Sequence, residues 1–411
     1  MVSENMYDKL AELVVRKGVN VQNGQPVIVK ADIHDAAFVK KVVKCAYEAG
    51  AKYVSVEWGD PDLTKMAYEY QTAEVLAEVP QWKYDRTKSQ HDEGACYISI
   101  TSEKPGAMAD VDSEKMKIAN LAYYSKMKDL AAYTMNNEGQ WCVFGIPSYE
   151  WAKAVFPDLD DEEAYEKLGD AIFAVTRVTE DNDPIAEWTR HDEELIEHAK
   201  KLNEYRFEKL HFTSELGTDL YVGLIEDHIW AGGGCYTPAG VFFDPNMPTE
   251  ECFCMPLKTG TDGIVYASKP LDYHGKLIED FWLRFEKGKV VEFDAKKEKE
   301  ALEQLLSFDE GSSYLGEVAL VPYDSPVSRS GILFFNTLYD ENAACHLALG
   351  RPYPENLAGG CDMTEEELAQ HGANDSMQHE DFMIGTKEMN IDGIRKDGTV
   401  IPVFRNGNFV F

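Results

Sequence analysis

The sequence predicts two domains of different class, an α/β domain with a parallel sheet followed by a mostly antiparallel α+β domain. Strand-like and helix-like segments alternate in the first half, and short strands punctuated by glycines dominate the second half. The length of 411 residues also exceeds one ordinary domain, which has roughly 100–200 residues. We expect the α/β domain to cover residues 1–205 and the α+β domain to cover residues 206–411.

The first half contains apolar segments at strand spacing and at helix spacing in turn. The expected strands are 26–30, 52–58, 96–101 and 141–146. The expected helices are 5–18, 35–49, 61–78, 113–130 and most of 160–205, which a turn at 179–184 interrupts. This alternation implies a parallel sheet covered by helices. The segment has neither the phosphate-loop motif nor the glycine fingerprint of dinucleotide-binding domains, so the sheet alone identifies no ligand.

Helical periodicity fades after about residue 207, and short apolar strands follow. The expected strands are 210–213, 219–225, 240–243, 263–267, 289–293, 317–322, 332–335 and 399–404. Two helices are expected within this half, at 294–306 and 363–371. This pattern indicates a mostly antiparallel domain with a few helices.

The composition is strongly acidic, with 40 Lys+Arg against 73 Asp+Glu and a net charge of −33. The acidic excess is spread over both halves, which argues against nucleic acids and anionic membranes as partners. It suits an acidic cavity that attracts metal ions or a free α-amino group. No apolar run approaches the roughly 18 residues of a membrane span, and no signal peptide is recognisable. We therefore expect a cytoplasmic protein whose eight cysteines are free thiols.

Metal-type side chains in the second half lie beside turn or strand signals. His379 and Asp381 are two residues apart before an apolar run, so in a strand they would face the same side and could reach one ion. Glu317 stands at the head of an apolar strand, where a buried carboxylate is costly without a compensating cation. The remaining candidates are Glu250, Glu251 and His346.

Imidazole together with carboxylate suits zinc, cobalt or manganese rather than calcium. Three carboxylates and two imidazoles exceed what one catalytic zinc takes, whereas two ions about 3.5–4 Å apart would use them all. Structural interpretations stay open at this point. They are a packed histidine for His346, an ion pair with Arg329 for Glu317, and a solvated turn for Glu250 and Glu251. The residues alone therefore leave a metal-dependent hydrolase as one of several interpretations.

Several ordered blocks carry a resemblance that extends over nearly the whole chain. They are residues 10–21, 24–27, 246–251, 315–321, 336–343, 345–350 and 379–386. In these blocks the chain resembles the aminopeptidase T and aminopeptidase S family, the two-metal metallo-aminopeptidases of bacteria. The resemblance implies an exopeptidase that removes N-terminal residues from peptides with a free N-terminus. It also implies a homodimer whose C-terminal domain encloses the metal site.

The resemblance assigns roles to individual residues. Its metal ligands fall on the five residues Glu251, Glu317, His346, His379 and Asp381, which would hold two divalent ions (zinc, cobalt or manganese).

The resemblance further places the family's active-site tyrosine on Tyr353, whose hydroxyl would donate a hydrogen bond to the oxyanion of the tetrahedral intermediate. The alternative for Tyr353 is a packed aromatic side chain between two prolines. Glu250 is adjacent to a ligand, and we regard it as a candidate for the catalytic base. One departure is the segment Cys252-Phe253-Cys254, where we expect Val-Phe-Thr in the family.

Two other functions stay open beside the aminopeptidase. The first is another metal-dependent hydrolase, acting on a non-peptide amide or a phosphoester. The acidic composition disfavours phosphoesters, because they are anionic. The second is a metal-binding or peptide-binding protein without turnover.

Overall fold

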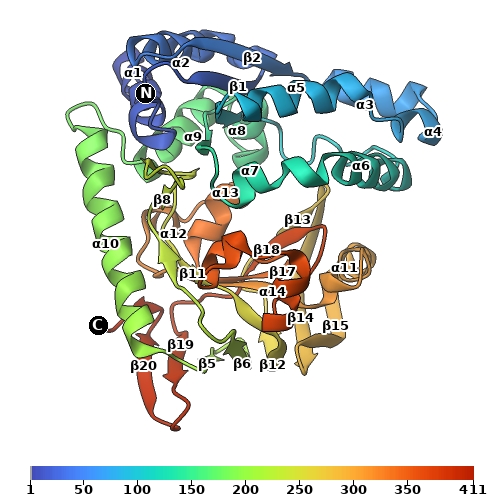
Figure 1. Ribbon diagram of the computed structural model, residues 1–411, viewed down its shortest axis with the longest axis vertical. Helices are drawn as coiled ribbons and strands as arrows, with labels where there is room; N and C mark the ends of the chain where they lie inside the picture. Colours follow the sequence, from blue (N-terminus) through green and yellow to red (C-terminus); the bar gives the residue numbers. More distant parts are fainter. Residues whose placement is uncertain (1) are drawn as a thin grey trace. The chain divides into compact units, whose positions relative to one another are not determined.

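The computed structural model describes residues 2–411, which fold as two compact units (Figure 1). Unit 1 comprises Met1–Arg190 and Gly234–Pro248, and unit 2 comprises His191–Gly233 and Thr249–Phe411. The division falls after Arg190, inside helix α10 (Pro184–Tyr205). The boundary predicted at residue 205 coincides with the end of this helix. The separation into independent domains at that residue stays a prediction.

Unit 1 contains a parallel five-stranded sheet in the order β10-β4-β3-β1-β2. The strands are β1 (Pro26–Asp32), β2 (Tyr53–Gly59), β3 (Cys96–Thr101), β4 (Trp141–Gly145) and β10 (Asn246–Met247). Four of them were expected from the sequence, and the parallel α/β class is confirmed. The fifth, β10, comes from the segment that returns to unit 1 from the second half, and two residues are too short to give a sequence signal.

The helices of unit 1 connect the strands. They are α1 (Glu4–Leu13), α2 (Ala36–Glu48), α3 (Pro61–Tyr70), α4 (Ala73–Leu76), α5 (Gln81–Asp92), α6 (Ser113–Met127), α7 (Ala132–Met135), α8 (Tyr149–Val155) and α9 (Asp161–Val175). The single helix expected over 61–78 is wrong. The chain becomes extended at Gln71, and the Thr72 side chain then caps the new helix α4 by accepting a hydrogen bond from the Val75 amide.

Unit 2 contains two antiparallel sheets, which confirms the predicted class. The first, sheet D, has five strands in the order β18-β17-β16-β11-β7. Its members are β7 (Ala231–Gly232), β11 (Cys252–Cys254), β16 (Leu315–Leu320), β17 (His346–Gly350) and β18 (His379–Met383). Every neighbouring pair in this sheet is antiparallel.

The second sheet, sheet B, has nine strands. They are β5 (Lys209–Thr213), β6 (Asp219–Leu224), β12 (Pro256–Tyr266), β13 (Leu271–Tyr273), β14 (Lys276–Glu286), β15 (Lys289–Lys297), β19 (Asn390–Ile394), β20 (Val400–Arg405) and β21 (Asn408–Phe409). One apolar core joins the two sheets, with Phe281 of β14 and Phe382 of β18 at 5.8 Å between ring centroids.

Two expectations for unit 2 are wrong. Residues 332–335 form no strand, because the chain turns there with Phe335 in the left-handed region at φ 54°. The helix expected over 294–306 begins only at Lys299 as α11 (Lys299–Leu306), since strand β15 continues to Lys297. Helix α14 (Glu365–His371) agrees with the prediction. Within residues 2–411, no helix is both long and apolar enough to cross a membrane.

Candidate metal centre

All five predicted ligands lie in unit 2, on or directly beside four neighbouring strands of sheet D. Glu251 immediately precedes β11, and Glu317 lies in β16. His346 is the first residue of β17, whereas His379 and Asp381 both belong to β18. Segments far apart in the sequence therefore meet because their strands pair.

The strand register places the ligands on one face of sheet D. Glu317 pairs with Ala348, which in turn pairs with Asp381, so these three side chains stand in one row. His346 is two residues before Ala348, and His379 is two residues before Asp381. Because side chains alternate between faces along a strand, both histidines share the face of Glu317 and Asp381.

The opposite face of the same strands is apolar. Val318, Leu347, Leu349 and Phe382 alternate with the ligands and belong to the buried core of unit 2. On the ligand face, Ala319 and Ala348 are the residues cross-strand from His346 and Glu317, and methyl side chains leave room above the sheet. The alternation thus separates an apolar core from a polar centre within one thin sheet.

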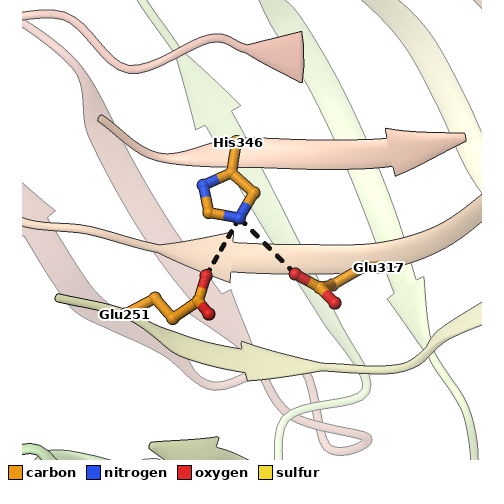
Figure 2. Close-up of side chains that lie close together, drawn as sticks. All are labelled: Glu251, Glu317 and His346. Atoms are coloured by element: carbon orange, nitrogen blue, oxygen red, sulfur yellow. Dashed lines mark ion pairs between the residues drawn. The ribbon is translucent and has the colours of Figure 1, made fainter. Parts of the chain in front are cut away.

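The first group of ligands comprises Glu251, Glu317 and His346 (Figure 2). The Nε2 atom of His346 lies 3.0 Å from Glu251 Oε2 and 3.5 Å from Glu317 Oε1. The two carboxylates approach the imidazole from neighbouring segments, and all three side chains point toward a common position. All three residues are buried, and the available ligand atoms lie within 4.8 Å of one another.

The second group comprises Glu317, His379 and Asp381. The Nε2 atom of His379 lies 3.4 Å from Asp381 Oδ1 and 3.8 Å from Glu317 Oε2. Glu317 therefore presents Oε1 to one histidine and Oε2 to the other. One carboxylate thus faces both ligand groups.

Both histidines are oriented by backbone carbonyl groups. His346 Nδ1 lies 3.0 Å from the carbonyl oxygen of Glu341, and His379 Nδ1 lies 2.6 Å from that of Arg351. A carbonyl only accepts, so Nδ1 carries the proton and Nε2 is left with its lone pair when the ring is neutral. Metal-binding histidines are usually fixed in this way.

Burial and mutual charge shift the acid–base properties of the cluster. Burial alone would lower the pKa of His379, but the charge and hydrogen bond of Asp381 raise this pKa to about 10. For His346, hydrogen bonds to Glu251 and Glu317 outweigh the lowering by burial and raise its pKa well above the ordinary value. Burial raises the pKa of Glu317. Without an ion, the two histidines thus hold protons where ions would bind.

Glu341 is a further carboxylate of this region, one that the sequence did not predict. It lies in a short 3-10 helix, Glu341–Ala343, just before β17. Burial, followed by the charges of Asp381 and Glu251, raises the pKa of Glu341 well above its ordinary value, so its carboxylate interacts electrostatically with members of both ligand groups. The sequence could have indicated Glu341 as a site residue, because it belongs to the block 336–343 that carries the family resemblance.

Tyr353 also reaches this centre, since its ring lies 5.0 Å from the ring of His379. Burial, with the charges of Glu317 and Asp381, raises the pKa of its hydroxyl well above the usual range. The phenol therefore stays protonated and can donate a hydrogen bond.

Glu250 belongs to neither ligand group. Its Oε2 lies 3.6 Å from His191 Nε2, and its amide donates to Asn342 Oδ1 at 2.7 Å. Its role as the base stays a prediction.

The alternative interpretations can also be compared with the geometry. Arg329 pairs with Asp324 at 3.0 Å and its side chain is exposed, so it is not the partner of Glu317. Cys252 and Cys254 are fully buried on the core face, and burial raises the pKa of both thiols. The departure from the family pattern at these cysteines therefore lies on the face opposite the ligands.

The residues present fit divalent metal ions. Glu251, Glu317 and Asp381 belong to the two ligand groups, and their charges act on Glu341, so these four carboxylates carry four interacting negative charges when ionised. Two divalent ions with two neutral imidazoles would balance these charges. Oxygen and imidazole donors are those that zinc, cobalt and manganese accept.

Comparison with known proteins decides the family. The family model described as "Thermophilic metalloprotease (M29)" matches residues 3–409. The chain belongs to this family. The resemblance predicted from the sequence is thereby confirmed.

Named relatives match nearly the whole length of the chain. Aminopeptidase AmpS of Bacillus subtilis is 46% identical over 98% of this chain and 97% of its own length. Aminopeptidase 2 of Geobacillus stearothermophilus is 43% identical over 99% of this chain and 98% of its own. The solved structure of wild-type AmpT from Thermus thermophilus has a TM-score of 0.92 and 40% identity, covering 99% of this chain and 100% of that one.

The shifted pKa values predict a pH dependence of stability in the metal-free M29 protein. Groups with a raised pKa bind more protons folded than unfolded, so the stability they contribute is lost as pH rises. For His379 the loss of stability begins near pH 6.5, its unfolded pKa, and is complete above its folded pKa of about 10. For Glu341 the loss begins near pH 4.5, its unfolded pKa. We expect Tm in EDTA to fall across this range.

Thermal unfolding measured in EDTA, and again with added Zn²⁺, tests this expectation. The Tm of the metal-loaded protein should fall less as pH rises, because bound ions replace the protons on the cluster. Glu341→Gln should make the Tm of the metal-free protein fall less steeply with rising pH. A metal-free Tm that rises with pH would contradict the expected sign.

Proposed function

We propose that this protein is a metallo-aminopeptidase that releases N-terminal amino acids from peptides with water activated by two divalent ions. Membership of a metalloprotease family supports metal-dependent hydrolysis, and relatives named aminopeptidases match it over nearly their whole lengths. The observation that carries the two-ion proposal is Glu317, whose two oxygens face two different histidines.

The side chains of the chain would divide the work as follows. Glu251, Glu317 and His346 would hold one ion, and Glu317, His379 and Asp381 the other. When bound, a pair of divalent ions lowers the pKa of a water molecule and polarises a carbonyl group.

The remaining groups would bind and orient the substrate. A peptide with a free α-amine carries a positive charge, which the carboxylates of the centre attract. Tyr353 would donate its hydroxyl proton in a hydrogen bond to the oxygen of the scissile carbonyl as negative charge develops there. Glu341 would add a fourth carboxylate to the centre.

Three finer points belong to the same proposal. The ions are zinc, cobalt or manganese, because imidazole and carboxylate ligands suit all three. The protein acts as a homodimer, as the family resemblance implies. It acts in the cytoplasm, a location supported by its eight cysteines, all of which are free thiols.

Hydrolysis of leucine p-nitroanilide tests the proposed activity. Purified protein treated with EDTA should be inactive, and added Zn²⁺, Co²⁺ or Mn²⁺ should restore cleavage. The N-acetylated substrate should resist cleavage with every metal, because it lacks the free amine. Protein that holds about two ions per chain and still cleaves no free-amine substrate would exclude this activity.

Neighbouring carboxylates with different surroundings provide a matched pair of variants. Glu251→Gln should lower metal affinity by more than the roughly 10–100-fold seen for partners of ligands, because it removes a direct ligand. Glu250→Gln should keep both ions, since this side chain faces His191. Metal content is measured after dialysis, together with kcat. Equal metal loss in both variants would contradict the assignment, whereas loss of kcat with full metal content in Glu250→Gln would support Glu250 as the base.

Removal of the Tyr353 hydroxyl should lower turnover without affecting the ions. Tyr353→Phe keeps the ring packed against His379 but deletes the donor, and loss of one oxyanion donor costs about 10²–10³ in kcat. Metal content and Tm should match those of the unchanged protein. An unchanged kcat at full metal content would remove Tyr353 from the mechanism.

A further inference from the structure

Lys30 occupies an unusual position in the parallel sheet of unit 1. It lies on β1, which pairs with β2 on one side and with β3 on the other, and it is the only basic residue in the five strands of this sheet. The inner strands of parallel sheets are normally apolar on both faces, because helices cover them. Lys30 is nevertheless exposed to solvent. The sheet is therefore open to solvent at this residue.

The open area occupies one half of one face of the sheet. Ile28, two residues before Lys30 and on the same face, belongs to a buried cluster with Tyr97 of β3 and Tyr133 of α7. These side chains cover the amino-terminal half of the face. Lys30 and Ser99 lie beyond them, each two residues before the carboxyl end of its strand.

The topology of the sheet gives this half a particular place. From β1 the chain passes to β2 on one side and then crosses back to β3 on the other side, so the strand order reverses between β1 and β3. In open α/β sheets, ligands bind beside the carboxyl ends of the strands at such a reversal. Lys30 of β1 and Ser99 of β3 flank this point.

Lys30 and Ser99 offer two adjacent hydrogen-bond donors. They are direct partners in the register of β1 and β3, so their side chains stand on the same face of strands that lie about 4.8 Å apart. Within residues 2–411, neither the Lys30 ammonium nor the Ser99 hydroxyl has an ion-pair or side-chain hydrogen-bond partner. The ammonium lies over the ring of Tyr97, 5.1 Å from its centroid. An ammonium beside a hydroxyl matches the two oxygens of a carboxylate.

The charges around Lys30 leave its ammonium without a counter-ion. Partial loss of hydration lowers the pKa of Lys30 even though solvent reaches the side chain, whereas the charge of Glu57 raises this pKa and that of Arg86 lowers it. Glu57 is the cross-strand neighbour on β2, but its two oxygens are bound by Gln90 at 3.0 Å and by Arg86 at 3.4 Å. An anionic ligand would supply the ion pair that the protein does not.

We propose that Lys30 and Ser99 form a binding site for the C-terminal carboxylate of a peptide. The ammonium and the hydroxyl each donate a hydrogen bond to one carboxylate oxygen. A free amino acid fits less well, because its own ammonium meets the positive charges of Lys30 and Arg86. The carboxylate site does not depend on the aminopeptidase function, whereas the choice of a peptide as its ligand rests on that proposed function.

Protection of Lys30 from acylation in the metal-loaded protein tests this site. Limiting acetic anhydride labels the amine, and peptide mass spectrometry measures the labelling rate. Lys88 serves as the reference lysine, because it is exposed and paired with Asp92 at 2.7 Å. N-acetylleucine, which carries the carboxylate of a peptide's last residue, should slow labelling of Lys30 and leave that of Lys88 unchanged.

Two further probes establish which chemical group is bound. N-acetylleucine amide lacks the negative charge and should give no protection at the same concentration. Free leucine should protect Lys30 only at a higher concentration than N-acetylleucine. Equal protection by the acid and the amide would overturn the carboxylate site, and stronger protection by leucine would overturn the assignment to a peptide.

Variants of Ser99 test the second donor while Lys30 stays available as the readout. Ser99→Ala should raise the N-acetylleucine concentration for half-protection by about tenfold, the scale of one hydrogen bond to a charged group. Ser99→Thr keeps a hydroxyl and should retain protection. Ser55→Ala is the matched control, because Ser55 lies on the same face of β2 but is in register with Ile28. Equal effects of Ser99→Ala and Ser55→Ala would overturn the site.

The outcomes separate this proposal from the function proposed above. No protection of Lys30 by N-acetylleucine, in protein that cleaves leucine p-nitroanilide, would overturn the carboxylate site alone. Protection in metal-loaded protein that cleaves no free-amine substrate would support the carboxylate site. It would overturn the aminopeptidase function, and with it the choice of a peptide as the ligand.

Discussion

The repulsion among four closely spaced carboxylates is the constraint on which the rest of unit 2 depends. Glu251, Glu317 and Asp381 belong to the ligand groups and their charges act on Glu341, so like charges interact strongly in this part of the protein. Such a cluster is stable only with positive charge between its members, supplied by protons on His346 and His379 or by metal ions. The requirement for cations is therefore part of the folded state as well as of catalysis.

Sheet D meets this constraint by dividing its two faces. The ligands stand on one face with alanines beside them, and the core of unit 2 occupies the other. Because each strand contributes only one or two ligands, the geometry of the centre depends on strand register and not on a local motif. A register shift of one residue would exchange the ligands with core side chains, so the packing of the core fixes the ligand positions.

The sequence predicted much of this arrangement, for reasons that differ between elements. His379 and Asp381 could be placed together because they share one strand with period-two spacing. Glu317 could be suspected because a carboxylate within a buried strand needs compensation. Pairing of β11, β16, β17 and β18 could not be derived from local patterns. The residue types suggested the five ligands, and the family resemblance assigned them to one centre. Glu341 was missed because it lies in a short 3-10 helix, and the break at Gln71 was missed because helical spacing continues on both sides of it.

The shared position of Glu317 has a consequence for the way the centre is filled. Its two oxygens face different ligand groups. If each group holds an ion, as proposed, an ion in the first group would orient the carboxylate for the second and withdraw electron density from the oxygen that the second ion would use. The two binding events would then be linked, and by thermodynamic reciprocity each ion would change the affinity for the other by the same factor. A centre filled in this way would respond to metal supply as a coupled pair and not as two independent sites.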